Sequence, residues 1–289
     1  MNTFEPQDIQ YTLQAAQQTL VAAGLTDSPK LDAELLLGHA LQVNRTYLYT
    51  WSDKALTTEQ LVQFQTLLNQ RTQGQPIAHI LGEREFWGLN LKVTADTLIP
   101  RPDTETLIEG VLELCARNQD DQNRSILDLG TGSGAIALAL KSELPNASVT
   151  AVDFSQNALE IAQHNALRHN LEINFLQSDW FSAIKPEQKF DFIVSNPPYI
   201  EESDPHLKQG DVRFEPITAL TAGQDGLDDI RKIAPKAWQH LNPLGWLLVE
   251  HGYNQAEAVA NIFTENGFSK VSLLIDFGGN PRVTIGQKA

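Results

Sequence analysis

The chain has 289 residues, of which 21 are basic and 36 acidic, so its formal net charge at neutral pH is -15. This length suggests two domains or one large one, and a hydrophobic content of 42% with 20% charged residues is ordinary for a globular protein. A nucleic-acid binder usually presents a basic field. The charge therefore argues against DNA or RNA as the main partner, although a small basic patch remains compatible with it.

The sequence also bears on the compartment. A single cysteine, Cys115, excludes an intramolecular disulfide and a zinc site built from several thiolates. Its apolar neighbours Val111, Leu112 and Leu114 indicate a core position. No apolar run approaches the roughly 18 residues of a membrane span, and the start, MNTFEPQDIQ, resembles no secretory leader. These features predict a cytoplasmic protein without membrane contact, and the acidic charge is compatible with a monomer.

Residues 1–75 are predicted to form a helical bundle. Apolar side chains recur near the helical period over residues 8–23, where Gly24 ends the pattern, and a second helix is expected to begin at Pro29. The residues TTEQ, starting at Thr57, resemble a capping box ahead of another helix. No catalytic cluster is apparent here. The bundle is interpreted either as a docking surface for a macromolecule or as an ordinary solvated domain.

Residues 76–100 are interpreted as a linker that contains a β-hairpin. Leu89, Leu91 and Val93 alternate with polar residues, as in a strand, and Gly88 separates them from the Phe86-Trp87 segment. A helix is expected to begin at Pro102, which suits a first helical turn.

Residues 101–289 alternate between strand-like and helix-like segments, the pattern of an α/β fold with a parallel sheet covered on both faces. Helices are expected at 135–144, 155–170, 219–241 and 255–266. Strands are expected at 125–130, 149–155, 173–180, 190–199, 245–252, 271–277 and 281–287, with the last two forming a hairpin around Gly278-Gly279.

A glycine-rich loop separates the first of these strands from the helix that follows. It consists of Gly130, Thr131, Gly132, Ser133 and Gly134. Glycines let a backbone turn sharply and approach a ligand, and Asp153 at the end of the next strand suits a ribose with two free hydroxyls. These features alone fit either a nicotinamide cofactor or S-adenosylmethionine.

Three observations favour S-adenosylmethionine. The loop lacks the GxGxxG spacing of dinucleotide sites. Asp128, two residues before the loop, would meet an ammonium group but would repel a pyrophosphate. Asp179 can accept from an adenine amino group and Trp180 can pack on the ring, although this pair also fits a turn followed by a core indole.

The segment SNPPY follows a buried strand at its carboxyl end, where open α/β sheets bind ligands. Its functional residues are Asn196, Pro197, Pro198 and Tyr199. The Asn196 amide can both donate and accept, the prolines remove N–H donors so that nearby carbonyls face a ligand, and Tyr199 offers a flat ring. Such a loop can hold a planar group that carries an NH2. The plainer interpretation is a strand-ending turn with a buried tyrosine.

These motifs resemble those of the class I S-adenosylmethionine-dependent methyltransferases and, more closely, of the release-factor glutamine N5-methyltransferases, the PrmC/HemK family. The resemblance covers PIAHILGEREFWGLNLKV, TLIPRPDTE, ILDLGTGSGAIALAL, AVDFSQNAL, SNPPYI, FEPITALTAGQDGL and GGNPRV, while the first seventy-five residues match loosely. It implies a Rossmann-like, seven-stranded, mostly parallel sheet with an antiparallel last strand. An N-terminal helical-bundle domain would precede it.

The resemblance also implies a reaction. S-adenosylmethionine would methylate the side-chain amide nitrogen (N5) of the glutamine in the GGQ motif of class I peptide chain release factors. Residues 130–134, Asp153, Trp180 and Asn196 match the family's methyl-donor positions, and residues 196–199 match its glutamine-binding loop. Hydrogen bonds from the glutamine NH2 to the Asn196 side-chain oxygen and the Pro197 carbonyl would aim the nitrogen at the methyl group. No general base is assigned, and no metal is expected.

Two other functions remain open. An N6-adenine methyltransferase of nucleic acids shares the NPPY logic, because adenine also presents an NH2 on a planar group. A binding module that has lost turnover is the third possibility, which the intact motifs disfavour. The segments Glu215-Pro216 and Asp225-Gly226 are interpreted as structural.

Overall fold

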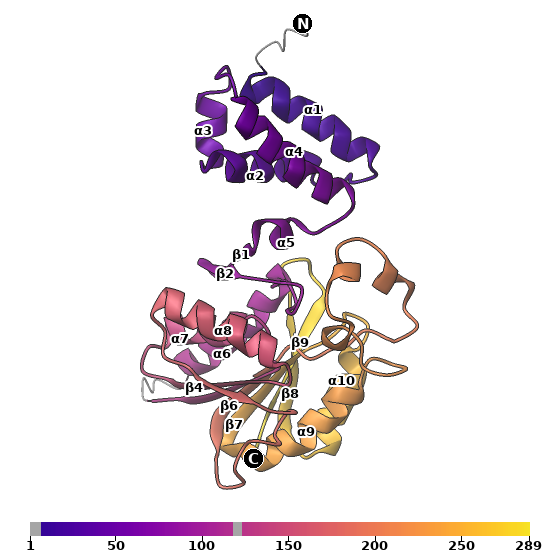
Figure 1. The fold of residues 1–289 in the computed structure, drawn as a ribbon. Helices are drawn as coiled ribbons and strands as arrows, with labels where there is room; N and C mark the ends of the chain where they lie inside the picture. The colour runs from indigo at the N-terminus through magenta and orange to yellow at the C-terminus, as the bar shows by residue number, and fades with distance from the viewer. Residues whose placement is uncertain (1–6, 118–122) are drawn as a thin grey trace, which may run out of the picture. The chain divides into compact units, whose positions relative to one another are not determined.

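The structure, a computed structural model, describes residues 7–117 and 123–289 (Figure 1). The first six residues, part of the stretch in which no leader is predicted, lie outside the described range. The chain divides into two compact units. One comprises residues 1–82 together with 208–214, and the other comprises 83–207 and 215–289.

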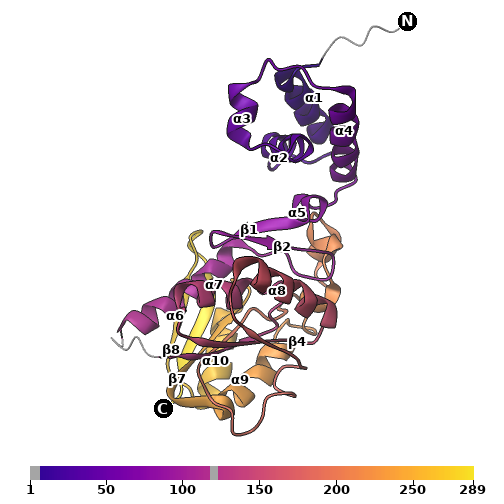
Figure 2. The same cartoon turned by 60° about the vertical axis from the view of Figure 1, so that its left-hand side comes forward.

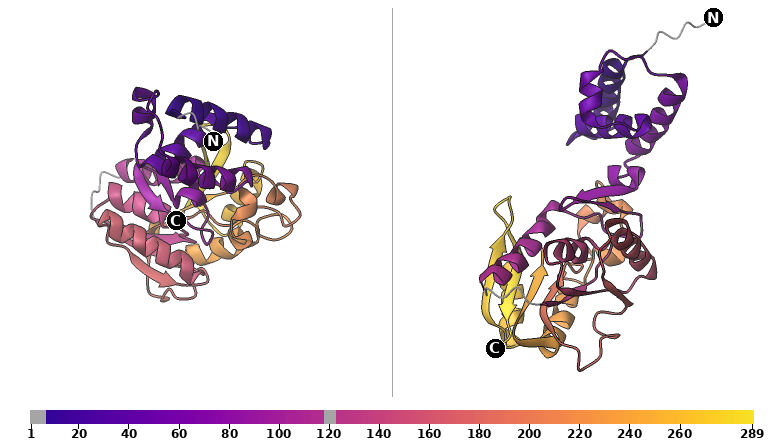
Figure 3. Two further views of the ribbon diagram at one scale, coloured as in Figure 1. Left: turned by 45° about the horizontal axis from the view of Figure 1, so that its top comes forward. Right: turned by 90° about the vertical axis from the view of Figure 1, so that its left-hand side faces the viewer.

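The first unit is a helical bundle whose helices α1 to α4 pack around a common apolar core (Figure 3). Its helices are α1 (Ile9–Ala22), α2 (Pro29–Leu41), α3 (Arg45–Thr50), α4 (Thr58–Thr72) and α5 (Ile77–Leu81). The Asp8 carboxylate accepts from the Tyr11 N–H at 2.7 Å and so caps α1. The capping box at Thr57 is confirmed, because Thr57 and Gln60 each accept from the other's backbone N–H. Helix α5 was not predicted; it ends at Gly82, whose φ is +75°.

Residues 208–214 join this bundle through one buried arginine. Arg71, on α4, pairs with Asp32 of α2 at 2.8 Å and with Asp211 at 2.9 Å. Its guanidinium also donates to the Gln75 carbonyl at 3.0 Å. A buried cation with this many partners fixes the segment that carries Asp211 to the bundle.

The second unit begins with the predicted hairpin, formed by β1 (Glu83–Phe86) and β2 (Leu89–Lys92). Both residues of its turn, Trp87 and Gly88, have positive φ, as a type I′ hairpin turn requires. The buried Asn165 side chain bonds both backbone groups of Lys92 and also donates to the Ser133 carbonyl at 2.9 Å. One amide therefore ties the hairpin to the glycine loop.

The predicted seven-stranded sheet is confirmed, in the order β5-β4-β3-β6-β7-β9-β8. Its strands are β3 (Ser125–Leu129), β4 (Ser148–Asp153), β5 (Asn174–Gln177), β6 (Phe190–Ser195), β7 (Leu241–Glu250), β8 (Ser269–Ile275) and β9 (Pro281–Gln287). Neighbours from β5 to β7 run parallel, whereas β9 runs antiparallel to both β7 and β8.

Helices cover both faces of the sheet, each over its own apolar core. On one face lie α6 (Glu105–Arg117), which follows the 3-10 turn η1 (Pro102–Thr104), α7 (Ala135–Glu143) and α8 (Gln156–His169) (Figure 2). On the other face lie α9 (Asp228–His240) and α10 (Ala256–Glu265). Among the described residues, no helix is long and apolar enough to cross a membrane.

The prediction of a helix over 219–241 is wrong in its first part. Only the short 3-10 turns η2 (Pro205–Lys208), η3 (Val212–Phe214) and η4 (Ile217–Ala219) precede α9, which begins at Asp228. Gly223 and Gly226 have φ of +74° and +71°, so the backbone between them and α9 cannot be helical. Cys115 is half-buried and packs at the edge of the core rather than within it.

Candidate active site

A cavity of about 400 Å³ lies at the carboxyl ends of the central strands. Strand β3 pairs with β4 on one side and with β6 on the other, so the loops that follow these three strands meet at one edge. Nine of the predicted site residues line the cavity: Gly130, Thr131, Gly132, Ser133, Asp153, Asp179, Trp180, Asn196 and Pro198. Four do not: Asp128, Gly134, Pro197 and Tyr199.

Asp153 organises the glycine loop. One carboxylate oxygen accepts from the Gly132 N–H and the other from the Ser155 N–H, both at 2.8 Å. Burial raises the pKa of Asp153, and these backbone donors oppose that shift. Backbone donors therefore hold both oxygens of this carboxyl in place beside the loop.

Gly134 has a packing role instead of a place on the cavity wall. Its φ is +87°, and a Cβ there would lie 2.8 Å from the Leu138 side chain and 3.2 Å from that of Ala162. Only glycine allows α7 and α8 to approach so closely.

Asp128 lies beneath the loop. It is fully buried, and one of its oxygens accepts from the Thr131 hydroxyl at 2.6 Å. The other oxygen has no hydrogen-bond partner within the described ranges. Burial raises the pKa of Asp128 to about 7. This carboxyl therefore reaches the cavity through the Thr131 hydroxyl instead of facing it.

Aromatic side chains form part of the wall. Trp180 lies against the loop, since its ring is 3.4 Å from the position of a Cβ on Gly130. Phe154 also lines the cavity and is 75% exposed, which leaves its ring available to a ligand. The sequence prediction missed Phe154; the available signal was an aromatic residue directly after the strand-ending Asp153.

The SNPPY loop is held by its neighbours in the fold. The Ser195 hydroxyl donates to the Leu129 carbonyl at 2.8 Å, which fixes the end of β6 to β3. The Asn196 amide donates to the Thr104 hydroxyl at 3.2 Å, while its Oδ1 has no hydrogen-bond partner among the described residues. The Tyr199 hydroxyl lies 3.4 Å from Glu250 Oε1, and burial raises the pKa of Tyr199. Asn196 thus lines the cavity and keeps one buried acceptor that no described group uses.

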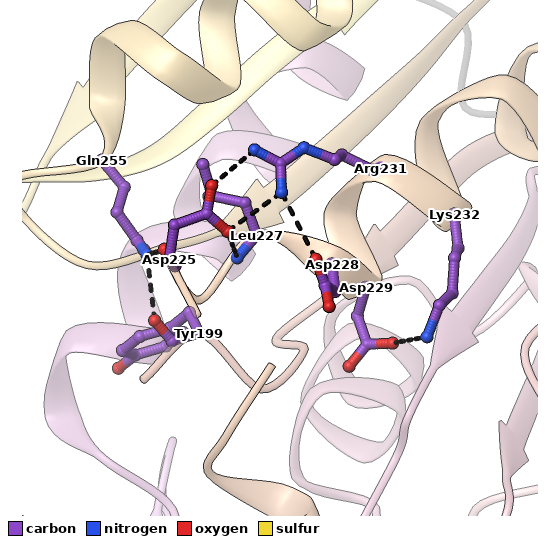
Figure 4. Close-up of polar contacts among 8 residues, drawn as sticks. All are labelled: Tyr199, Asp225, Leu227, Asp228, Asp229, Arg231, Lys232 and Gln255. Carbon is purple, nitrogen blue, oxygen red and sulfur yellow. Dashed lines mark hydrogen bonds and ion pairs between the residues drawn. The ribbon is translucent and has the colours of Figure 1, made fainter. Parts of the chain in front are cut away.

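Figure 4 shows how Gln255 and the turn at Asp225 support this loop from behind. The Gln255 amide donates to the carbonyl oxygens of Tyr199 and Asp225, at 2.9 and 3.0 Å. Arg231 binds the Asp225 carboxylate with two N–H groups, at 2.6 and 2.9 Å. A Cβ on Gly226 would lie 2.1 Å from the Tyr199 carbonyl oxygen. Asp225 and Gly226 therefore have a structural role, because the turn that they form packs directly on the SNPPY loop.

The sequence analysis interpreted Glu215-Pro216 as structural, but the structure places this segment at the cavity. Pro216 lines the wall, and the buried Glu215 carboxylate pairs at 2.6 Å with Arg101, which also lines it. Within the described part of the chain, no group of three or more His, Cys, Asp or Glu side chains is arranged to hold a metal.

Comparisons with known proteins identify the relatives of this chain. The family described as PrmC N-terminal domain matches residues 12–82, and the methyltransferase small domain family matches residues 108–211. A Vibrio cholerae protein named release factor glutamine methyltransferase is 51% identical over 282 residues, which are 96% of each chain. An Escherichia coli protein of the same name is 49% identical over 281 residues, covering 97% of this chain and 99% of the relative.

Solved structures show the same fold at low sequence identity. A Pyrococcus furiosus methyltransferase superposes with a TM-score of 0.51 at 21% identity, over 79% of this chain and 98% of its own. A Thermus thermophilus 16S rRNA methyltransferase, solved with AdoMet and guanosine, has the same TM-score and identity over 72% of this chain and 50% of its own.

Proposed function

Because the chain belongs to the release factor glutamine methyltransferase family, we propose that it methylates the glutamine of the GGQ motif in class I peptide chain release factors. The methyl donor is S-adenosylmethionine and the acceptor is the side-chain amide nitrogen (N5). The observation that carries this proposal is that Asn196 lines the cavity and that its buried side-chain oxygen has no hydrogen-bond partner among the described residues.

The cavity residues fit S-adenosylmethionine. Its volume of about 400 Å³ lies in the range of small-molecule sites. Asp153 provides acceptors for two ribose hydroxyls, Asp179 provides one for an adenine amino group, and Phe154 and Trp180 provide ring faces. The acidic lining favours a cationic ligand over one that carries phosphates. When bound, S-adenosylmethionine supplies an electrophilic methyl group on its sulfonium.

The SNPPY loop supplies the positioning. A carboxamide nitrogen is a weak nucleophile, because its lone pair is delocalised into the carbonyl. Asn196 Oδ1 and the Pro197 carbonyl accept from the glutamine NH2, which favours a pyramidal nitrogen and aims it at the methyl group. Pro198 and Tyr199 stiffen the loop that holds these acceptors. We assign no general base; the proton leaves to water after methyl transfer.

Methyl transfer from labelled S-adenosylmethionine to an unmodified release factor tests this proposal. The controls are the factor with its GGQ glutamine replaced, a duplex DNA, and the Asn196→Ala enzyme. Label is expected on the intact factor alone. Label on DNA and none on the factor would instead establish the N6-adenine reaction, and donor binding without any label would indicate a module that lacks turnover.

We propose further a division of labour along the chain: residues 1–75 dock the release factor, residues 76–100 act as a linker, and residues 101–289 carry out the methyl transfer. We also propose that the protein works as a monomer and does not bind DNA. Exposed apolar side chains support the docking role: Trp51 is 53% exposed and Val62 is 62% exposed. Replacing either with serine is expected to raise KM for the release factor and leave donor affinity unchanged. Phe277→Ser, at a site 80% exposed in the other unit, is the control. Equal effects of all three would contradict the division.

A further inference from the structure

Two basic side chains stand among the described residues that line the cavity, and the proposed mechanism uses neither. They are Arg101, which precedes η1, and Lys232 on α9. S-adenosylmethionine carries one carboxylate, at its methionine end. A carboxylate that leaves water needs a cation or several N–H donors. The acidic residues of the wall would repel it, so one of the two basic side chains is the natural partner.

The two basic residues belong to different parts of the wall. Lys232 lies on α9, which packs on the same apolar core as Trp180, and its ammonium group binds Asp229 at 2.9 Å (Figure 4). Arg101 precedes η1, whose last residue accepts a hydrogen bond from Asn196 at 3.2 Å. With the donor bound as proposed above, Lys232 is on the adenine side. Arg101 is on the side of the methyl group and the carboxylate.

Arg101 is oriented by a buried partner. Its Nη2 donates to Glu215 Oε1 at 2.6 Å, and the Glu215 side chain is fully buried whereas that of Arg101 is 33% exposed. A guanidinium has five N–H donors in a planar fork, so one such bond leaves donors for another acceptor. Arg101 can therefore hold Glu215 on one edge and a ligand carboxylate on another.

The backbone beside Arg101 is also restrained. Asp103, two residues later, is bound by Arg282 of β9 at 3.0 Å, and the Arg282 guanidinium binds Asp276 as well, at 3.1 Å. Arg282 shows that one guanidinium in this fold can serve two carboxylates. A side chain that is fixed before its ligand arrives loses less conformational entropy on binding, so its contact contributes more to affinity.

We infer that Arg101 binds the carboxylate of S-adenosylmethionine, and that Glu215 is the positioning residue that orients the Arg101 guanidinium. This inference deepens the proposed function and rests on the donor site assigned there. The contact holds the methionine end of the donor and thereby helps to set the position of the sulfonium methyl group relative to Asn196.

Decarboxylated S-adenosylmethionine tests the contact, because it lacks only the carboxylate. The Kd of each compound is measured for wild type and for Arg101→Met by calorimetric titration. Arg101→Met is expected to raise the Kd for S-adenosylmethionine about tenfold to a hundredfold, as for the loss of a hydrogen bond to a charged group. The Kd for the decarboxylated compound should rise by no more than about twofold, because that compound has no group for Arg101 to bind.

Lys232→Met is the matched control. It removes the other basic side chain of the wall, so the net charge of the cavity changes by the same amount as in Arg101→Met. An effect of net charge alone would appear in both variants. A direct contact with the carboxylate predicts that the selective loss of affinity for S-adenosylmethionine is confined to Arg101→Met.

A second variant separates the contact from folding. Arg101→Met takes the cation away from the buried Glu215 carboxylate, which destabilises the protein. The double variant Arg101→Met/Glu215→Gln removes both charges and should show the same selective loss. 5′-Methylthioadenosine, which lacks the whole amino acid, reports on the adenosine part of the site. Its Kd should be the same in wild type and in the double variant.

Two results would overturn the inference. An equal loss of affinity for S-adenosylmethionine and its decarboxylated form would show that Arg101 only maintains the shape of the cavity. An unchanged Kd for both compounds would show that other groups, such as backbone N–H groups, bind the carboxylate. Neither result would affect the proposed function, which fails only if the wild-type enzyme leaves the release factor unlabelled.

Discussion

Substitution of Gly226 by alanine probes the contact between the turn at Asp225 and the SNPPY loop. Gly226 is buried and has a φ of +71°. A Cβ would lie 2.1 Å from the Tyr199 carbonyl oxygen and 2.7 Å from the Gln255 amide nitrogen that donates to it. The backbone must therefore move, because a carbonyl oxygen cannot rotate away as a flexible side chain can.

Two costs add in this variant. The left-handed conformation costs a residue with a Cβ about 1–2 kcal/mol. Overpacking a well-filled site costs about 1–3 kcal/mol more. The free energy of unfolding should fall by roughly 2–5 kcal/mol in total. A displaced Tyr199 carbonyl also moves the acceptors of the loop, so kcat should fall by about tenfold to a hundredfold.

The matched control is Gly279→Ala, in the turn between β8 and β9. Its φ is +83°, but a Cβ there would meet no atom within 4 Å, so it has the conformational cost alone. Urea unfolding and methyl-transfer kinetics of both variants isolate the overlap with Tyr199. If Gly226→Ala proved no less stable than Gly279→Ala and equally active, the turn would not brace the loop.

Three further results are expected. Asp153→Asn should raise the Kd for S-adenosylmethionine about tenfold to a hundredfold in calorimetric titrations. The reason is that a hydrogen bond to a charged group contributes about 1.5–3 kcal/mol. An unchanged Kd would show that Asp153 does not bind the ribose. The pKa of Asp128 is about 7 in the folded protein, against an ordinary value of 3.8. Between these values the folded protein keeps the Asp128 carboxyl protonated, whereas the unfolded chain releases that proton. The free energy of unfolding should therefore fall as the pH rises from about 4 to 7, by up to about 1.4 kcal/mol per pH unit. In Asp128→Asn this slope should be smaller, and urea unfolding across that range would show whether it is. Arg71→Met leaves Asp32 and Asp211 without their cation and should destabilise the helical unit by about 3–5 kcal/mol. The Kd for S-adenosylmethionine should be unchanged, because every residue that lines the cavity lies in the other unit. A higher Kd in this variant would show that the helical unit contributes to donor binding.

Local signals in the sequence determined much of the architecture. The capping box at Thr57 marked a helix start that the structure confirms, because such a cap depends on residues three positions apart. The glycines of residues 130–134 and Asp153 stood between strand and helix in the expected order, and most of them line the cavity. The alternation of segments likewise predicted the sheet and the helices on its faces.

The support of the loop was decided only by the tertiary structure. Thr104 and Asn196 are 92 positions apart, and Gln255 reaches Tyr199 across 56 positions. Gly226 appeared in the sequence as part of a helix, since periodicity cannot show that its backbone turns against a distant carbonyl. Sequence patterns report the faces of elements, whereas the partner of a buried amide or carboxyl depends on which elements the fold brings together.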